Sequence, residues 1–235
     1  MTGSLTTIGF DADDTLWHNE RYFALSHDRF AELLVEHSDR DPLMERLLEA
    51  ERRNLPHYGY GIKGFTLSMI ETAIEVTEGR VPTEVISELL AAGRDMLAHP
   101  IELLPHVEDV LENLTGRYRL LVITKGDLLD QERKLAQSGL RDRFDGVEIV
   151  SHKTEEAYRE IFARQGEGAA RGLMVGNSLA SDVRPMLAAG GWGVHVPHDL
   201  TWAMEHAERP GDAPRFAEIT DLSELPELIE RIDVG

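Results

Sequence analysis

"TTIGFDADDTLWHNE", residues 6–20, joins a short apolar run to three acids that fall within four positions: Asp11, Asp13 and Asp14. The apolar run up to Phe10 predicts a buried strand. Carboxylates this close to one another repel and resist burial, so they need a cation, a phosphate-handling role or open solvent. Residues elsewhere in the chain, or a ligand that they bind, must therefore offset the repulsion between these carboxylates at the end of the strand.

The composition describes a globular protein with a substantial core. The chain has 235 residues, of which 42% are hydrophobic and 29% charged, as in ordinary soluble domains. It has no cysteine, which excludes disulfides, thiolate metal sites and a cysteine nucleophile. No run approaches the roughly 18 apolar residues of a membrane span, and the N-terminus lacks the pattern of a signal peptide. We therefore expect a cytoplasmic protein with no membrane partner.

The net charge of −19 argues against a nucleic-acid partner, because such binding requires a basic face. A small anionic substrate remains compatible with this charge, since a few convergent cations or a bound metal can reverse the local field. We interpret most of the negative charge as a contribution to solubility.

Residues 19–98 show helical periodicity throughout, with apolar residues at three- and four-residue spacings. From Pro105 onward, apolar strand-like runs alternate with helical patterns, which is typical of a parallel sheet covered by helices on both faces. The first strand has no partner of its own and should join that sheet. We predict an α/β fold, a doubly wound parallel sheet formed by residues 1–17 and 101–235, with an α-helical domain inserted at residues 18–100.

Polar residues follow four of the predicted strands. In doubly wound sheets, ligands bind at the carboxyl ends of the strands, so these residues should converge on one site. They are Asp11 and Asp13, then Thr124 and Lys125, then Lys153, and finally Asn177, Ser178 and Asp182.

These residue types suit a magnesium-assisted reaction of a phosphate. Carboxylate and amide oxygens are the ligands that Mg²⁺ prefers, and Asp11 is placed to attack phosphorus. Asp13 would protonate the leaving oxygen and then activate water. Thr124 and Lys153 would hold the phosphoryl group and neutralise its charge. Lys125 is a further candidate for binding the substrate, although neighbours on a strand point to opposite faces. Asn177 and Asp182 would complete the metal site, with either of them as the direct ligand.

The segments FDADDTL, VITKGD, SHKTEEAY and VGNSLASD resemble, in this order, the four motifs of the haloacid dehalogenase-like (HAD) hydrolase superfamily. The resemblance spans the whole chain. It implies that Asp11 is the nucleophile and Asp13 the acid/base, with Thr124 and Lys153 as phosphoryl ligands. It also implies that the Asp13 main-chain carbonyl binds Mg²⁺, and that the helical insert is a cap domain that selects a small phosphorylated substrate.

The sequence departs from the family pattern at two positions. Asn177 stands where many members have Asp, and Asp14 where many have Gly. The amide oxygen of Asn177 can still bind Mg²⁺, but the site has one negative charge fewer. We expect Asp14 to point away from the nucleophile and to pair or cap locally.

The motifs predict a phosphatase acting through an aspartyl phosphate, and three alternatives stay open. A phosphomutase or phosphotransferase would use the same core, and a catalytically weakened binding protein would fit the neutral Asn177. A phospho-accepting signalling domain also uses Asp, Thr and Lys, but such domains are shorter. A dehalogenase is disfavoured, because dehalogenating members of the family lack the acid/base equivalent to Asp13.

GYGIKG, residues 59–64, matches a dinucleotide-binding pattern but follows a helical segment, so we reject a nucleotide cofactor there. Its glycines either expose amide groups that bind an anion, with Lys63 adding charge to a substrate site, or form an ordinary interhelix turn. The ten histidines show no metal-binding spacing such as HExxH. His198 is accordingly expected at the surface or in packing. His18 and Trp17 directly follow the first motif and could face the ligand site, although for Trp17 we favour packing beneath the helical insert.

Overall fold

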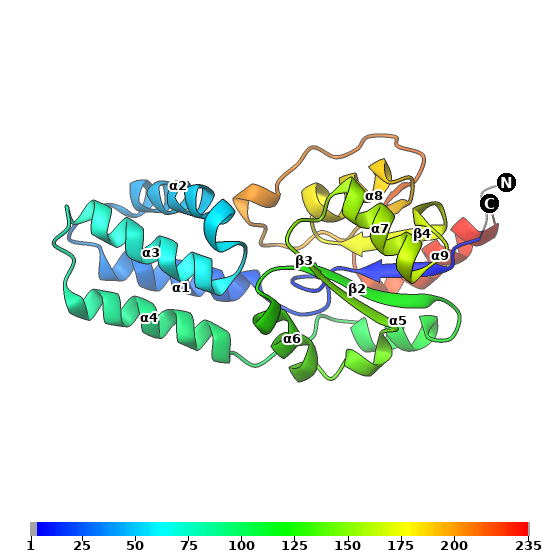
Figure 1. Ribbon diagram of the computed structural model, residues 1–235, viewed down its shortest axis with the longest axis horizontal. Coiled ribbons are helices and arrows are strands. Elements are labelled where there is room, and N and C mark those ends of the chain that lie inside the picture. Colours follow the sequence, from blue (N-terminus) through cyan, green and yellow to red (C-terminus); the bar gives the residue numbers. More distant parts are fainter. Residues whose placement is uncertain (1–3, 235) are drawn as a thin grey trace. The chain divides into compact units, whose positions relative to one another are not determined.

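The computed structural model describes residues 4–234 (Figure 1). These residues divide into two compact units. The sheet unit comprises the chain up to Glu20, Ile101–Lys125 and the chain from Gln131 onward, and the helical unit comprises Arg21–Pro100 and Gly126–Asp130.

The sheet unit contains a six-stranded parallel sheet in the order β3-β2-β1-β4-β5-β6. The central strand β1 pairs with β2 on one side, where Phe10 lies beside Val122, and with β4 on the other, where Phe10 lies beside Val175. The strands are β1 (Thr7–Phe10), β2 (Arg119–Lys125), β3 (Gly146–Val150), β4 (Gly172–Gly176), β5 (Trp192–His195) and β6 (Phe216–Glu218).

Side chains alternate between the two faces of this sheet, and each face has its own apolar core. Ile8 and Phe10 of β1 belong to the larger core cluster, whereas Ile123 of β2 and Met174 of β4 belong to the cluster on the opposite face. A Cβ added to Gly9 would lie 2.9 Å from the Ile123 side chain, so the strand has no room for a larger residue there.

Helices cover both faces of the sheet (Figure 1). The larger core cluster includes α5 (Val107–Leu114), α9 (Leu225–Val234) and Leu135 of α6 (Leu128–Gln137), and the opposite cluster includes α7 (Glu155–Gln165) and α8 (Arg184–Ala188). The sheet grows from β1 through β2 to β3 on one side and from β4 through β5 to β6 on the other. The strand order therefore reverses between β1 and β4, and folds of this type bind ligands at the carboxyl ends of the strands at that point.

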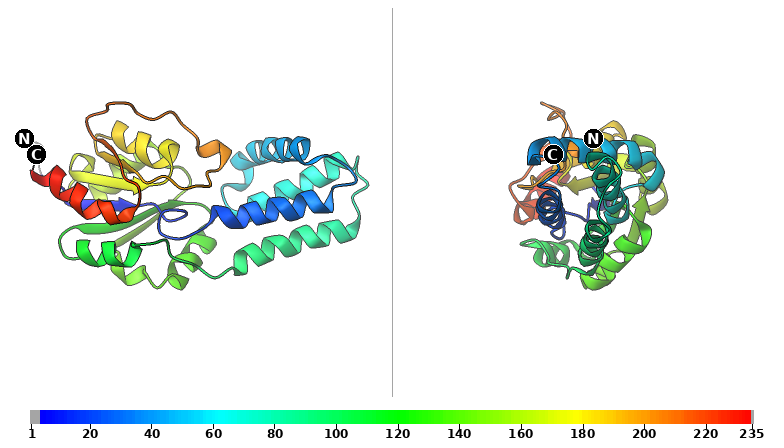
Figure 2. Two further views of the ribbon diagram at one scale, coloured as in Figure 1. Left: turned by 180° about the vertical axis from the view of Figure 1, so that it is seen from behind. Right: turned by 90° about the vertical axis from the view of Figure 1, so that its left-hand side faces the viewer.

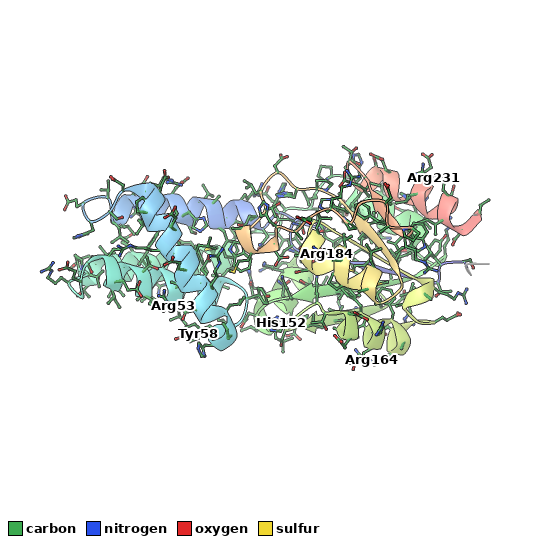
Figure 3. The ribbon with its side chains drawn as sticks, turned by 90° about the horizontal axis from the view of Figure 1, so that it is seen from above. Arg53, Tyr58, His152, Arg164, Arg184 and Arg231 are labelled. Carbon is green, nitrogen blue, oxygen red and sulfur yellow. The ribbon has the colours of Figure 1, made fainter. Side chains whose placement is uncertain are left out.

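The helical unit is built from α1 (Glu20–Leu33), α2 (Arg40–Tyr58), α3 (Ile62–Val76) and α4 (Thr83–Ala98), which Figure 2 shows as long helices lying alongside one another. Its own apolar core is formed by Phe30, Leu34, Leu43, Leu47, Ile62, Phe65, Met69, Ala73, Leu89 and Met96. Arg53 on α2 (labelled in Figure 3) binds Glu71 and Glu75 of α3 at 2.8 and 2.7 Å.

The glycine-rich turn between α2 and α3 depends on backbone that side chains rarely adopt. Gly59 and Gly61 have φ values of 71° and 106°, in the region that favours glycine. Lys63, in the first turn of α3, forms an ion pair of 2.9 Å with Asp127. This contact lies within the helical unit, which includes the short segment Gly126–Asp130.

The doubly wound parallel sheet predicted from the sequence is confirmed, and the segment expected to be helical forms the four helices α1–α4. The chain after the fourth strand departs locally from a simple alternation of strands and α-helices. There the chain makes a π-helical turn, Leu179–Val183, before the short α8. Among residues 4–234, no helix has the length and apolarity needed to cross a bilayer.

Packing within the helical unit yields a prediction for two identical substitutions. Leu47→Ala removes a side chain that is 1% exposed in the bundle core, whereas Leu25→Ala removes one that is 60% exposed on α1. We expect Leu47→Ala to lower the free energy of unfolding by about 2–5 kcal/mol, since it creates a cavity, and Leu25→Ala to change it by less than about 0.5 kcal/mol. Urea unfolding followed by circular dichroism measures both, and equal effects would contradict the described packing.

Candidate active site

A single lysine joins two buried acids at the carboxyl edge of the sheet. The Lys153 ammonium, at the end of the loop after β3, contacts Asp11 after β1 and Asp182 after β4, the latter at 2.6 Å. The side chains of Lys153 and Asp182 are 2% and 1% exposed. Three residues distant in the sequence thus form a buried ion triad of two acids and one ammonium group.

The end of β4 is shaped to admit the Asp182 carboxyl group. A Cβ added to Gly176 would lie 2.2 Å from Asp182 Oδ2, so only glycine leaves enough space at that position. The Ser178 backbone N–H donates to the same oxygen at 3.0 Å. With Lys153 bound to the other oxygen, both oxygens of Asp182 have partners within the protein.

The side chain of Asn177 lies against the first motif. One atom of its terminal amide group is 3.3 Å from the Asp13 carbonyl oxygen and 3.2 Å from Asp11 Oδ2. The hydrogen-bond network favours nitrogen at that position, where it donates to both oxygens. Turning the amide by 180° would present three oxygens to a common point, which is the donor set that Mg²⁺ prefers. These residues therefore fit a magnesium ion when the Asn177 amide turns its oxygen toward Asp11 and the Asp13 carbonyl.

Thr15 fixes this corner of the site. Its hydroxyl lies 3.3 Å from Asp11 Oδ2, to which it donates, and it accepts from the Asn177 backbone N–H at 3.1 Å. Asp11 is itself held in place by its backbone N–H, which donates to the Val175 carbonyl at 2.9 Å. The strand pairing between β1 and β4 therefore sets the distance between Asp11 and Asn177.

Three donors hold the carboxylate of Asp13. Trp17 Nε1 donates at 2.7 Å, Gln131 Nε2 at 2.8 Å, and Lys134 Nζ contacts both oxygens at 3.0 and 3.1 Å. Burial raises the pKa of Asp13, but the charge of Lys134 and these hydrogen bonds outweigh it and hold the pKa below its ordinary value. In this arrangement Asp13 is ionised, the form that accepts a proton.

The end of β2 brings a hydroxyl and a second ammonium group to the same edge of the sheet. Thr124 is 3% exposed. The Lys125 ammonium contacts the carboxylate of Glu205 and donates to Ser181 Oγ at 2.7 Å. Glu205 also accepts from Ser178 and Ser181, so the predicted substrate cation Lys125 is engaged with an anion of the protein itself.

The structure places Lys63, a further predicted substrate cation, in the helical unit with Asp127 as its ion-pair partner. It also adds residues that the sequence did not single out. Gln131 and Lys134 project from a helix, and Glu205 comes from the long segment between β5 and β6. None of them follows a strand directly, so selecting the polar residues at the ends of predicted strands could not find them. Trp17 was expected near the first motif, and its contact with Asp13 gives it a role there.

The pKa of Asp11 is raised from 3.8 to about 7, because burial and the charge of Asp182 outweigh the opposing charge of Lys153. Asp11 is thus harder to ionise in the folded protein than in the unfolded chain. Between these two values the folded state binds more protons, so this group makes the protein less stable as the pH rises from 3.8 to about 7.

We expect Asp11→Asn to stabilise the metal-free protein, since it removes this unfavourable ionisation and leaves Lys153 paired with Asp182 alone. A gain of about 1 kcal/mol corresponds to a rise in Tm of roughly 2–4 °C for a chain of this size. The gain should be largest above pH 7 and shrink toward pH 5, which thermal unfolding in EDTA at a series of pH values would measure.

The matched control is Asp142→Asn, the same chemical change at an exposed position, which should alter the free energy of unfolding by less than about 0.5 kcal/mol at any pH. A lower Tm for Asp11→Asn at pH 8, or a gain that does not depend on pH, would contradict this account of the ion triad.

Comparison with known proteins shows the family to which the chain belongs. A family model described as haloacid dehalogenase-like hydrolase matches residues 5–190. A haloacid dehalogenase-like hydrolase of Xanthomonas campestris is 40% identical with a TM-score of 0.88, and the match covers 98% of this chain and 93% of that one. No curated protein matches the chain at a comparable level of significance.

Two more distant structures share the fold. A HAD-hydrolase of Bacillus subtilis, described as bound to magnesium, is 18% identical with a TM-score of 0.67 over 96% of this chain and 99% of that one. A 2-haloacid dehalogenase of Pseudomonas syringae is 22% identical with a TM-score of 0.61, over 97% and 99% of the two chains. The match over residues 5–190 and the relative from Xanthomonas campestris show that this chain belongs to the haloacid dehalogenase-like hydrolase family.

Proposed function

We propose that this hydrolase is a Mg²⁺-dependent phosphatase that cleaves a small soluble phosphomonoester in the cytoplasm through an aspartyl phosphate on Asp11. The observation that carries the proposal is Asp13, two positions after the nucleophile, with its carboxylate held by Trp17, Gln131 and Lys134. An alkoxide leaving group needs a proton, and Asp13 is the residue placed to supply it.

In the first step, an oxygen of Asp11 attacks phosphorus while the bond from phosphorus to the ester oxygen breaks. Protonated Asp13 gives its proton to that oxygen, and the alcohol leaves. Because Lys134 favours the ionised form of Asp13, we infer that Asp13 takes up its proton when its carboxyl group separates from Lys134.

In the second step, water attacks the phosphorus of the aspartyl phosphate. The carboxylate of Asp13 accepts a proton from that water, and the bond between phosphorus and the Asp11 oxygen breaks. Inorganic phosphate and the original carboxylate of Asp11 are regenerated. The arrangement seen around Asp13, with Lys134 holding it ionised, suits this second step.

Charge on the phosphoryl group is balanced by residues at the strand ends. Lys153 lies against Asp11 and would neutralise both the nucleophile and the transferring group. The Thr124 hydroxyl would bind a phosphoryl oxygen. Asp11, the Asp13 carbonyl and Asn177 would hold Mg²⁺, with Asp182 supporting the site through Lys153. When bound, Mg²⁺ neutralises negative charge on the phosphate and on Asp11.

We assign the helical insert, residues 18–100, the role of a cap that selects the substrate and excludes bulk water. Lys63 and Lys125 are the candidate cations for the remainder of the substrate. To bind it, each would exchange its present carboxylate partner, Asp127 or Glu205, for an anionic group of the substrate. A cap that closes would leave room only for a small substrate.

Dehalogenation is the competing reaction, since a 2-haloacid dehalogenase shares the fold. A halide leaves as a stable anion and needs no proton, so a dehalogenase would have no use for an acid at position 13. The three donors that orient the Asp13 carboxylate favour the phosphatase.

The direct test is p-nitrophenyl phosphate hydrolysis by wild type, with Mg²⁺ and with EDTA, beside Asp11→Asn and Asp13→Asn. We expect Mg²⁺-dependent release that falls at least about 10³-fold in Asp11→Asn, which lacks the nucleophile. Asp13→Asn should cost about 10²–10⁴-fold, the usual contribution of an acid/base group.

The control variant is Asp142→Asn, which should retain wild-type activity. Halide release from 2-chloropropionate is measured in parallel. Full phosphatase activity in Asp11→Asn would refute the nucleophile assignment, and halide release without phosphate release would make the protein a dehalogenase.

A second prediction concerns Lys134, which lowers the pKa of Asp13. Lys134→Met removes that charge, so the pKa of Asp13 should rise and less carboxylate should be available to activate water. The acidic limb of the pH profile of kcat should move to higher pH by roughly one unit, as expected for loss of a close opposite charge. Arg133→Met, on the adjacent position of α6, should leave the profile in place; a shift toward lower pH in Lys134→Met would contradict the assignment.

A further inference from the structure

A second group of metal-ligating side chains lies in the sheet unit outside the Asp11 site. Ligand atoms of Asp14, His18 and His198 all lie within 4.8 Å of one another. We propose that these three residues bind a divalent transition-metal ion of the zinc class. The proposal rests on their own geometry and is independent of the proposed phosphatase activity.

Asp14 is directed away from the Asp11 site by its backbone. Its φ of 59° lies in the left-handed region, which Asp and Asn tolerate better than most residues. Its Oδ1 accepts from the Asn19 N–H at 2.8 Å, and its Oδ2 from the Glu20 N–H at 2.9 Å. Asp13 instead turns toward Lys134, so two consecutive acids serve separate clusters.

His198 is oriented as metal-binding histidines are. Its Nδ1 lies 3.0 Å from the Leu200 carbonyl oxygen, and its Nε2 lies 3.6 Å from Asp14 Oδ1. Nδ1 also lies 3.3 Å from the Leu200 backbone nitrogen. The shorter contact to the carbonyl favours the proton on Nδ1, so that the ring donates to that carbonyl and presents the Nε2 lone pair toward Asp14. Ligating histidines usually donate their second ring nitrogen in this way, and ligating carboxylates are themselves hydrogen-bonded, as Asp14 is.

His18 supplies the third ligand from a segment with a defined backbone. Its N–H donates to the Glu102 carbonyl at 3.0 Å, and its ring lies 6.0 Å from the ring of His198, centroid to centroid, in an edge-to-face arrangement. The ligand atoms lie within 4.8 Å of one another. Small side-chain rotations would place all three at the metal–ligand distances of about 2.0–2.2 Å that zinc requires.

The ligand set selects the class of ion. Two imidazoles and one carboxylate suit Zn²⁺, Co²⁺ or Ni²⁺, whereas Mg²⁺ prefers oxygen ligands. Three protein ligands leave a fourth tetrahedral position for water or a small anion. The bound ion would join the loop after β1 to the segment after β5, so it should stabilise the folded protein, which alone presents the three ligands together.

The test is isothermal titration of the full-length chain with Zn²⁺ in excess Mg²⁺, which keeps the oxygen-rich Asp11 site occupied by magnesium. We expect one equivalent of Zn²⁺ to bind and to raise Tm, and Co²⁺ to give the visible absorption of a nitrogen-ligated ion. His18→Gln and His198→Gln should each weaken binding at least about tenfold. Asp14→Asn, which keeps the backbone conformation and the local hydrogen-bond acceptor, should also weaken it.

His206→Gln is the matched control, because His206 is an exposed histidine on the same segment as His198, and Asp11→Asn shows whether the catalytic site contributes. Both should bind Zn²⁺ as wild type does. Absence of Zn²⁺ binding, or binding that His18→Gln and His198→Gln leave unchanged, would overturn the proposal and reduce the Asp14–His198 contact to an ion pair.

Discussion

The ion triad of Asp11, Lys153 and Asp182 is the interaction on which the site depends. Two carboxylates are buried against one ammonium group, and burial of unbalanced charge is costly unless the partners are close and hydrogen-bonded. The triad therefore requires three strand ends to meet within a few ångströms, and the parallel sheet provides that. When Asp11 is ionised, the triad carries one uncompensated negative charge beside Asn177, and a cation would balance it.

The sheet topology explains why this arrangement forms at the ends of β1 and β4. The sheet extends from β1 through β2 to β3 on one side and from β4 to β6 on the other, and in such sheets ligands bind at the carboxyl ends where the strand order reverses. Backbone pairing sets the position of Asp11 against β4. Gly176 then leaves the space that Asp182 occupies. Precise placement of the acids thus follows from sheet hydrogen bonds rather than from the acids themselves.

The loop after β1 separates three neighbouring acids into three environments. Asp11 meets Lys153, Asp13 meets Lys134, and Asp14, with its left-handed backbone, faces Asn19 and His198. The like charges that looked difficult to accommodate in the sequence are tolerated because each has its own donors. The expectation that Asp14 points away and caps locally is confirmed by its hydrogen bonds to the backbone of residues 19 and 20.

Sequence periodicity alone determined the alternation of strands and helices, the helical segment after the first strand, and the polar residues at the strand ends. These features are local, since a strand or helix pattern is readable within a short window. Tertiary structure alone decided that Asn177 lies against Asp11, that Lys134 binds Asp13 from a helix, and that Glu205 engages Lys125. Those contacts join residues far apart in the chain, and their geometry depends on strand register and helix docking, which no local pattern encodes.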